Sequence, residues 1–200
     1  MFHIAGGAGR PRGHVLRVTP VGSVRRRAAR SKDLDLLVRV PARLEARLDR
    51  VLADVRLGRR RAGDRVEALL HREGGPRRRA LTALGRTPGG RARRYRVDLF
   101  AATGAEWPFA LFHYTGDSAY NIRTRAHAKA RGWRLNQYGL FVAGTDRRAR
   151  GSAAVRSERD LAGALGVTYR PPHARESGPS ARQERPAVRR PRARARRAAN

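Results

Sequence analysis

Residues 33–40 read DLDLLVRV, a leucine- and valine-rich run that ends at Pro41 and predicts a β-strand. Residues two apart on a strand share a face, so Asp33 and Asp35 point the same way while apolar side chains occupy the other side. Aspartate is a poor strand former, and two like charges side by side repel. Any fold that contains this strand must therefore bring positive charge to the two carboxylates.

Two sources of that charge are open. The carboxylates could lie on a solvated face and pair with neighbouring arginines, or they could hold a divalent cation, since Mg²⁺ takes one or two protein carboxylates and completes its shell with water and phosphate oxygens. Asp98 in YRVDLF supplies a third carboxylate in the middle of another predicted strand. If the two strands are neighbours, the three acids can hold two ions about 4 Å apart, which is an arrangement that activates a hydroxyl and stabilises a leaving phosphate.

Gly22 and Ser23 stand ten residues ahead of these acids and are followed by Arg25 and Arg26. A Gly-Ser turn offers backbone N–H groups and a hydroxyl to an anion, and glycine permits close approach. Alone this is a weak signal, but followed by arginines and an Asp-x-Asp strand it predicts a phosphate-binding loop beside the metal site.

The rest of the chain divides into periodic segments and turns. Residues 64–72 fit either a strand or a helix. The other expected elements are a strand from His14 that turns at Thr19-Pro20, an amphipathic helix at 41–57, strands at 78–86 and 91–100 joined by a TPGG turn, a short helix after Thr103 that ends at Gly116, a helix from Asp117 or Ser118 to Gly132, a strand or hairpin at 133–142, and a capped helix at 157–166.

The composition points to a polyanionic partner, because the formal net charge is +30 and the only lysines are Lys32 and Lys129. Arginine forks suit phosphate, although arginine enrichment can also reflect coding bias. The chain has no cysteine, which excludes disulfides and thiolate metal sites. No apolar run is long enough for a membrane span and the N-terminus lacks a signal-peptide core, so we expect a soluble intracellular protein with no membrane partner; nucleus, cytoplasm and virion all remain open.

Several motifs in one order resemble the nucleotidyltransferase core of family X DNA polymerases. They are GSVRR, DLDLLV, RVDLF, FHYTG, YNIRTRAHA, LNQYGLF and LGVTYRPPHARE, and together they span about residues 18 to 176. Two positions depart from the family pattern: Arg27 and Lys32 stand where family members usually carry glycine or another residue that loosens the turn. The resemblance does not extend to a helix-hairpin-helix lyase domain, so lyase activity is not expected.

The resemblance implies a role for each matching residue. Asp33 and Asp35 would bind both metal ions and Asp98 the catalytic one, with two Mg²⁺ as cofactor and Mn²⁺ as a possible substitute. Arg96 and Arg125 would contact DNA: the first at the primer terminus, the second on the minor-groove side of the nascent pair. The implied nucleotide-binding residues are Gly22, Ser23, Arg26, Tyr114, Gly116 and Asn121.

Plainer interpretations stand beside these roles. Asn121 and Arg125 are four residues apart and share a helix face that could simply be solvated. His113 could contact a nucleotide or pack. The aromatic residues expected in the core rather than in a binding platform are Trp107, Phe109, Phe112 and Tyr114.

Taken together, the sequence predicts an α+β protein with a mixed or antiparallel sheet and flanking helices. The expected parts are a flexible N-terminus at 1–13, a palm domain at 14–103, a small α+β thumb at 104–176 and a disordered basic tail at 177–200. The resemblance implies a monomeric DNA-directed DNA polymerase that uses DNA and deoxynucleoside triphosphates, for short-gap filling in repair. The alternatives are a template-independent nucleotidyltransferase on the same core and an inactive basic protein that binds nucleic acid.

Overall fold

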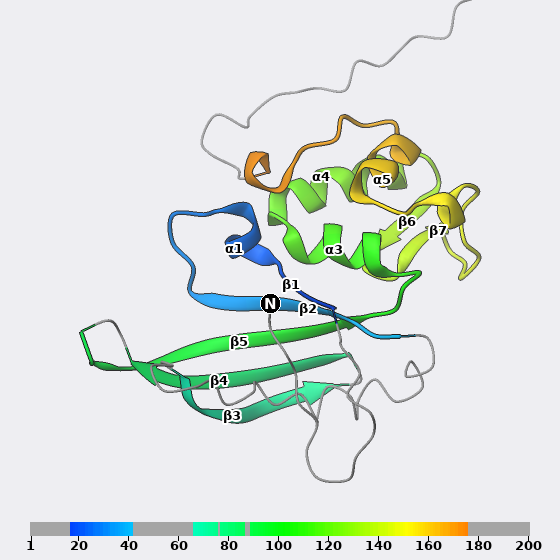
Figure 1. Ribbon diagram of the computed structural model, residues 1–200. Helices are drawn as coiled ribbons and strands as arrows, with labels where there is room; N and C mark the ends of the chain where they lie inside the picture. Colours follow the sequence, from blue (N-terminus) through cyan, green and yellow to red (C-terminus); the bar gives the residue numbers. More distant parts are fainter. Residues whose placement is uncertain (1–16, 42–65, 76, 87–88, 176–200) are drawn as a thin grey trace, which may run out of the picture.

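The computed structural model describes residues 17–41, 66–75, 77–86 and 89–175 (Figure 1). The described residues before Thr103 contain a five-stranded sheet in the order β1-β2-β5-β4-β3. Its strands are β1 (Arg17–Pro20), β2 (Asp33–Arg39), β3 (Val66–Gly75), β4 (Arg78–Arg86) and β5 (Ala92–Ala102). A short helix, α1 (Gly22–Arg26), lies between β1 and β2.

The sheet is mixed, because β2 runs parallel to β5 while the other neighbouring strands pair antiparallel. The parallel register sets Asp33 opposite Arg96 and Asp35 opposite Asp98. Strands far apart in the sequence therefore become neighbours at the acidic positions. The predicted α+β class with a mixed sheet is confirmed.

Alternation along β2 and β5 gives the sheet two apolar faces. On one face a buried cluster contains Leu36, Val38, Val40, Leu81, Ala83, Val97, Leu99 and Ala101. On the other face Leu37 and Ala102 pack against Trp107 and Ala110 of α3 (Trp107–Thr115). This second face also carries the three aspartates, because residues 33, 35 and 37 share one side of β2 and residues 98, 100 and 102 share the same side of β5.

The C-terminal part covers the α3 side of the sheet with helices and one hairpin (Figure 1). Its own core includes Phe109, Phe112, Leu140 and Leu161. The elements are α3, α4 (Ser118–Lys129), β6 (Trp133–Asn136), β7 (Gly139–Val142), η2 (Ser152–Ala154), α5 (Glu158–Leu165) and η3 (Pro172–Ala174). Within the described ranges, no helix has the length and apolarity needed to cross a bilayer.

Local signals in the sequence predict several of these elements correctly. The Asp117 side chain caps α4 by accepting from the Tyr120 N–H at 2.7 Å, and Ser157 caps α5 by accepting from the Asp160 N–H at 3.1 Å. The β4–β5 and β6–β7 pairs form as antiparallel strands, and the ambiguous segment at 64–72 contributes the strand β3.

Two local predictions are wrong. Gly22-Ser23 begins the five-residue helix α1 rather than a turn. The strand β1 continues through Pro20 instead of turning there; β1 is an edge strand, so a proline with no N–H is tolerated. The flexible N-terminus predicted at 1–13, all but the first residue of the helix predicted at 41–57, and the basic tail predicted at 177–200 lie outside the described residues.

Candidate active site

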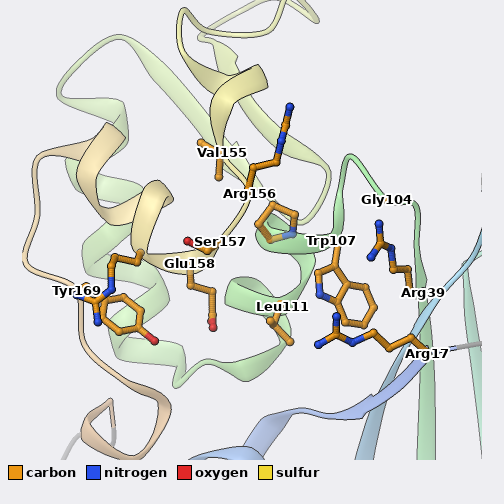
Figure 2. A pocket seen from close by; sticks show the side chains of 12 residues that line it. Arg17, Arg39, Gly104, Trp107, Leu111, Val155, Arg156, Ser157, Glu158 and Tyr169 are labelled. Carbon is orange, nitrogen blue, oxygen red and sulfur yellow. The ribbon is translucent and has the colours of Figure 1, made fainter.

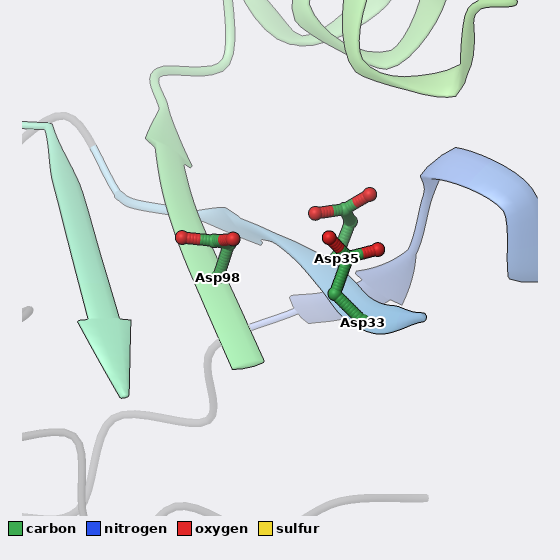
Figure 3. Close-up of side chains that lie close together, drawn as sticks. All are labelled: Asp33, Asp35 and Asp98. Carbon is green, nitrogen blue, oxygen red and sulfur yellow. The ribbon is translucent and has the colours of Figure 1, made fainter. Parts of the chain in front are cut away.

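Three carboxylates gather on the sheet face below α3 (Figure 3). Asp33 and Asp35 come from β2 and Asp98 comes from the adjacent β5. Each offers an oxygen that lies within 4.8 Å of the others. The predicted convergence of these three side chains is therefore present in the structure.

The two possible sources of compensating charge, arginine side chains and a bound cation, apply to different carboxylates of this cluster. Asp98 is 4% exposed and accepts hydrogen bonds from Arg78 Nη2 at 2.8 Å and from Arg96 Nε at 3.1 Å. In the described part of the chain no such ion pair forms at Asp33 or Asp35. Arginine thus compensates Asp98, whereas the other two carboxylates still require positive charge.

Asp35 shows the consequence of that imbalance. Burial, followed by the charges of Asp33 and Asp98, raises the pKa of Asp35 to about 6, and Arg26 and Arg96 offset only part of the rise. A bound cation would remove this penalty. The donors are all hard carboxylate oxygens, which are the ligands Mg²⁺ and Mn²⁺ prefer, so these residues fit a divalent metal site.

Gly22 allows α1 to approach this site closely. Its φ is +59°, and a Cβ at this position would overlap Asp35 Oδ2 and lie 3.0 Å from Asp35 Cγ. The Val21 N–H also donates to the Asp35 carbonyl oxygen at 2.9 Å. A glycine is therefore required both for the backbone conformation and for the contact between α1 and β2.

A cleft of about 430 Å³ opens directly beside the carboxylates. It is lined by all six residues predicted to bind the nucleotide, together with Asp33, Asp35 and Arg125. Arg96 does not line it and lies instead on β5, against Asp98. The remaining lining residues, which the sequence reasoning did not assign to the site, are His113, Asp117, Ser118 and Ile122.

Contacts from α1 to the end of α3 shape one wall of this cleft. Arg26 Nη1 donates to the Thr115 carbonyl oxygen at 2.5 Å. A Cβ on Gly116 would lie 3.2 Å from the same Nη1, and the φ of Gly116 is +69°. Tyr114 stacks on Phe100 with ring centroids 4.0 Å apart, and burial is the main cause that raises its pKa to about 12. Arg26 is therefore held at the cleft by its hydrogen bond to a backbone carbonyl, and the Tyr114 hydroxyl stays protonated.

A second part of the cleft lining is built on His113. Asn121 Nδ2 donates to the His113 carbonyl oxygen at 2.7 Å, and Arg125 Nη2 lies 2.6 Å from His113 Nδ1. Burial, then Arg125, lowers the pKa of His113 to about 4, so the imidazole is neutral near pH 7. One face of α4 is thus bound to the end of α3, and His113 both packs and lines the cleft.

Sequence reasoning missed two features around the site. The first is Arg78, which could have been anticipated because pairing 78–86 with 91–100 brings it near Asp98. The second is a buried group that joins α1 to α5. Glu158, with a side chain 5% exposed, accepts from Arg25 at 2.6 and 3.0 Å and from Arg175 at 2.8 Å. Nothing local in the sequence marks this group.

Comparison with known proteins places the chain in a family. Residues 110–176 match the family model described as DNA polymerase beta thumb. A repair DNA polymerase X from the Badajoz strain of African swine fever virus is 34% identical over 158 residues, which cover 79% of this chain and 80% of that protein. The same enzyme from a Kenyan isolate is 44% identical over 81 residues, 40% of this chain and 44% of that protein.

A solved structure agrees with the architecture. The ternary complex of polymerase beta from Leishmania infantum superposes with a TM-score of 0.58 at 23% identity, covering 81% of this chain and 68% of that one. It supports the fold, and the viral relatives support the sequence relationship. The chain therefore belongs to family X of the DNA polymerases.

Proposed function

We propose that this polymerase adds deoxynucleotides to a primer 3′-hydroxyl on a DNA template and fills short gaps during repair. The observation that carries the proposal is the junction of the three-carboxylate cluster with the cleft that holds Arg26, Gly22 and Ser23. A nucleotidyl transfer site needs these two parts side by side: one for the reacting oxygen and one for the triphosphate.

Asp33, Asp35 and Asp98 would hold the metal ions. When bound, two Mg²⁺ or Mn²⁺ ions lower the pKa of the primer 3′-hydroxyl and stabilise the charge of the departing pyrophosphate. Arg78 and Arg96 each donate a hydrogen bond to one oxygen of Asp98, and so hold that carboxylate in place. Arg96, whose side chain is about half exposed, would also contact the primer terminus.

The cleft residues would bind and check the incoming nucleotide. Arg26 and Ser23 would contact the phosphates, and Gly22 lets them approach. Tyr114 and Gly116 would lie against the sugar.

A second set of residues would act on the nascent base pair rather than on the triphosphate: Asn121 and Arg125 from α4. Minor-groove acceptors are nearly the same for every pair, so such contacts test shape without reading sequence.

We further propose that the sheet with α1 is the palm and that the elements after Thr103 are the thumb. The boundary lies at a strongly bonded turn: the Thr103 N–H donates to Glu106 Oε2 at 3.0 Å, and Arg77 donates to the same carboxylate at 2.6 Å. Such a turn fixes the point at which the chain leaves the sheet.

The test is extension of a one-nucleotide gapped duplex and of an open primer-template by wild type, Asp98→Ala and the control Asp146→Ala, with Mg²⁺ and with EDTA. Asp146 is a fully exposed acid paired to Arg134, so its loss should change nothing. Asp98→Ala should abolish extension and nearly preserve DNA binding, because its two arginine partners remain about half exposed. Equal extension by wild type and Asp98→Ala would refute the site, and extension without template would indicate a template-independent transferase instead.

Binding should also depend strongly on salt. Each phosphate neutralised by arginine contributes a slope of about −0.9 to the plot of log affinity against log salt concentration. A flat plot for the gapped duplex would contradict electrostatic DNA contact.

A further inference from the structure

A second cleft, of about 590 Å³, lies between α3, the beginning of α5 and the edge of the sheet (Figure 2). None of the described residues lines both this cleft and the one beside the carboxylates. Arg39, on its sheet side, follows Asp35 by four residues along β2, which places it roughly 13 Å further along the strand. This is a separate place on the molecule.

Four arginines line the cleft: Arg17, Arg39, Arg156 and Arg159. Among the described residues, no carboxylate forms an ion pair with any of these four side chains. Two of them are positioned on aromatic rings, Arg17 at 5.4 Å from the centre of Trp107 and Arg159 at 4.7 Å from that of Tyr169. The ring contacts orient the guanidinium groups but leave their charge uncompensated.

Among the described residues that line the cleft, Glu158 is the one acid, and its charge is already balanced. Both of its oxygens accept hydrogen bonds from Arg25, and one accepts from Arg175 as well. Two guanidinium groups therefore face a single carboxylate. When Arg25 and Arg175 are counted together with Glu158, the surroundings of the cleft still carry a large positive charge.

The shape and chemistry of the cleft select an anion that carries more than one phosphate. Arg17 and Arg39 stand on the sheet side, whereas Arg156 stands just before α5. Arg159 belongs to the first turn of α5 itself. Between them the wall is apolar, formed by Trp107, Pro108, Leu111 and Val155. Guanidinium forks match phosphate oxygens, and charges on both sides of the space would hold phosphates at both ends of a ligand.

We propose that this cleft is a second phosphate-binding site, which takes an oligophosphate ligand. The phosphates belong either to a free compound such as pyrophosphate or a nucleoside triphosphate, or to a DNA strand. The proposal does not depend on metal binding by the three aspartates. It adds a binding site to the polymerase without adding a chemical step.

The test removes charge from both sides of the cleft with the double substitution Arg39→Gln/Arg159→Gln. Both side chains are exposed, so the variant should fold, which thermal unfolding will check. The matched control is Arg150→Gln, an exposed arginine that lines neither cleft. Pyrophosphate is titrated by calorimetry in EDTA at low salt, and Arg26→Gln identifies the signal of the nucleotide cleft.

Wild type and Arg150→Gln should bind two pyrophosphates. In the double variant, the affinity for pyrophosphate at the site that Arg26→Gln retains should fall about ten- to a hundredfold. If a labelled single-stranded oligonucleotide also binds more weakly to the double variant than to Arg150→Gln, the natural phosphates are those of DNA; if oligonucleotide binding is unchanged, they belong to a free compound.

Two results would overturn the proposal. One is that the double variant binds pyrophosphate and oligonucleotide as Arg150→Gln does. The other is that a polyglutamate peptide displaces pyrophosphate from this cleft and binds it more tightly, which would make the partner an acidic protein segment. A failure of the metal site would appear separately, as loss of primer extension in Asp98→Ala with both pyrophosphate sites retained.

Discussion

Replacing Gly22 by alanine should damage both stability and catalysis. A non-glycine residue in the left-handed region, here at a φ of +59°, costs about 1–2 kcal/mol. The new Cβ would also overlap Asp35 Oδ2 and force either α1 or the carboxylate to move, an overpacking cost of about 1–3 kcal/mol. The free energy of unfolding should therefore fall by roughly 2–5 kcal/mol.

Two matched substitutions separate these terms. Gly132 has a φ of +72° and nothing within 4 Å of its Cβ position, so Gly132→Ala carries the backbone cost alone, about 1–2 kcal/mol. Gly163 lies inside α5 with equally open space and no left-handed φ, so Gly163→Ala should gain about 0.5–1 kcal/mol. Urea unfolding of the three variants gives the cost of the steric clash at Gly22. That cost is the loss of unfolding free energy in Gly22→Ala minus the loss in Gly132→Ala.

The same comparison tests the geometry of the site. A displacement of about 1 Å at a catalytic group can reduce the rate about a hundredfold, so Gly22→Ala should extend primers about that much more slowly than wild type. Gly132→Ala should extend at the wild-type rate. If Gly22→Ala and Gly132→Ala lose the same stability and extend primers equally well, the close contact between α1 and Asp35 is not what positions the carboxylate.

Three further outcomes follow from single contacts. Arg27 has a φ of 61°, so Arg27→Gly should raise the free energy of unfolding by about 0.5–1 kcal/mol in urea; an unchanged or lower value would contradict strain at this position. The folded pKa of His113, about 4, lies below its unfolded value of 6.5, so its neutral form is favoured in the fold. Stability from this group is complete above pH 6.5 and is lost as the pH falls toward 4; thermal unfolding of wild type should decline more over that range than that of His113→Gln, and parallel curves would rule the effect out. Glu158→Gln leaves the fully buried Arg175 without its carboxylate and should cost about 3–5 kcal/mol, whereas Arg25→Gln should cost less because Arg175 still pairs with Glu158; equal losses would contradict the shared ion pair.

The parts of the fold that could be predicted from the sequence are those with local causes. The strand at Asp33–Arg39 follows from its leucine and valine content, and the caps at Asp117 and Ser157 follow from side chains that accept the first free N–H groups of a helix. The pair of aspartates two residues apart already required compensating charge. These signals lie within a few residues of what they predict.

The remainder depends on contacts between distant segments. The parallel pairing of β2 with β5 joins residues more than sixty positions apart. The sequence could therefore predict that Asp35 and Asp98 converge only on the condition that their two strands are neighbours. The strand patterns posed that condition, and only the family resemblance implied that it is met. Glu158 carries no local signal at all, because the arginines that bind it come from positions 25 and 175.

The helix α1 shows how these long-range contacts determine the site. Five residues are too few for a helix to be stable alone, so its conformation must come from its neighbours. Gly22 fits against Asp35, Arg25 binds Thr115 Oγ1 and Glu158, and Arg26 binds the Thr115 carbonyl oxygen. The residues that would grip the triphosphate therefore depend at once on the sheet that carries the metal ligands and on the C-terminal elements that carry Glu158. A substitution at either end of this chain of contacts should loosen nucleotide binding even where no cleft residue is changed.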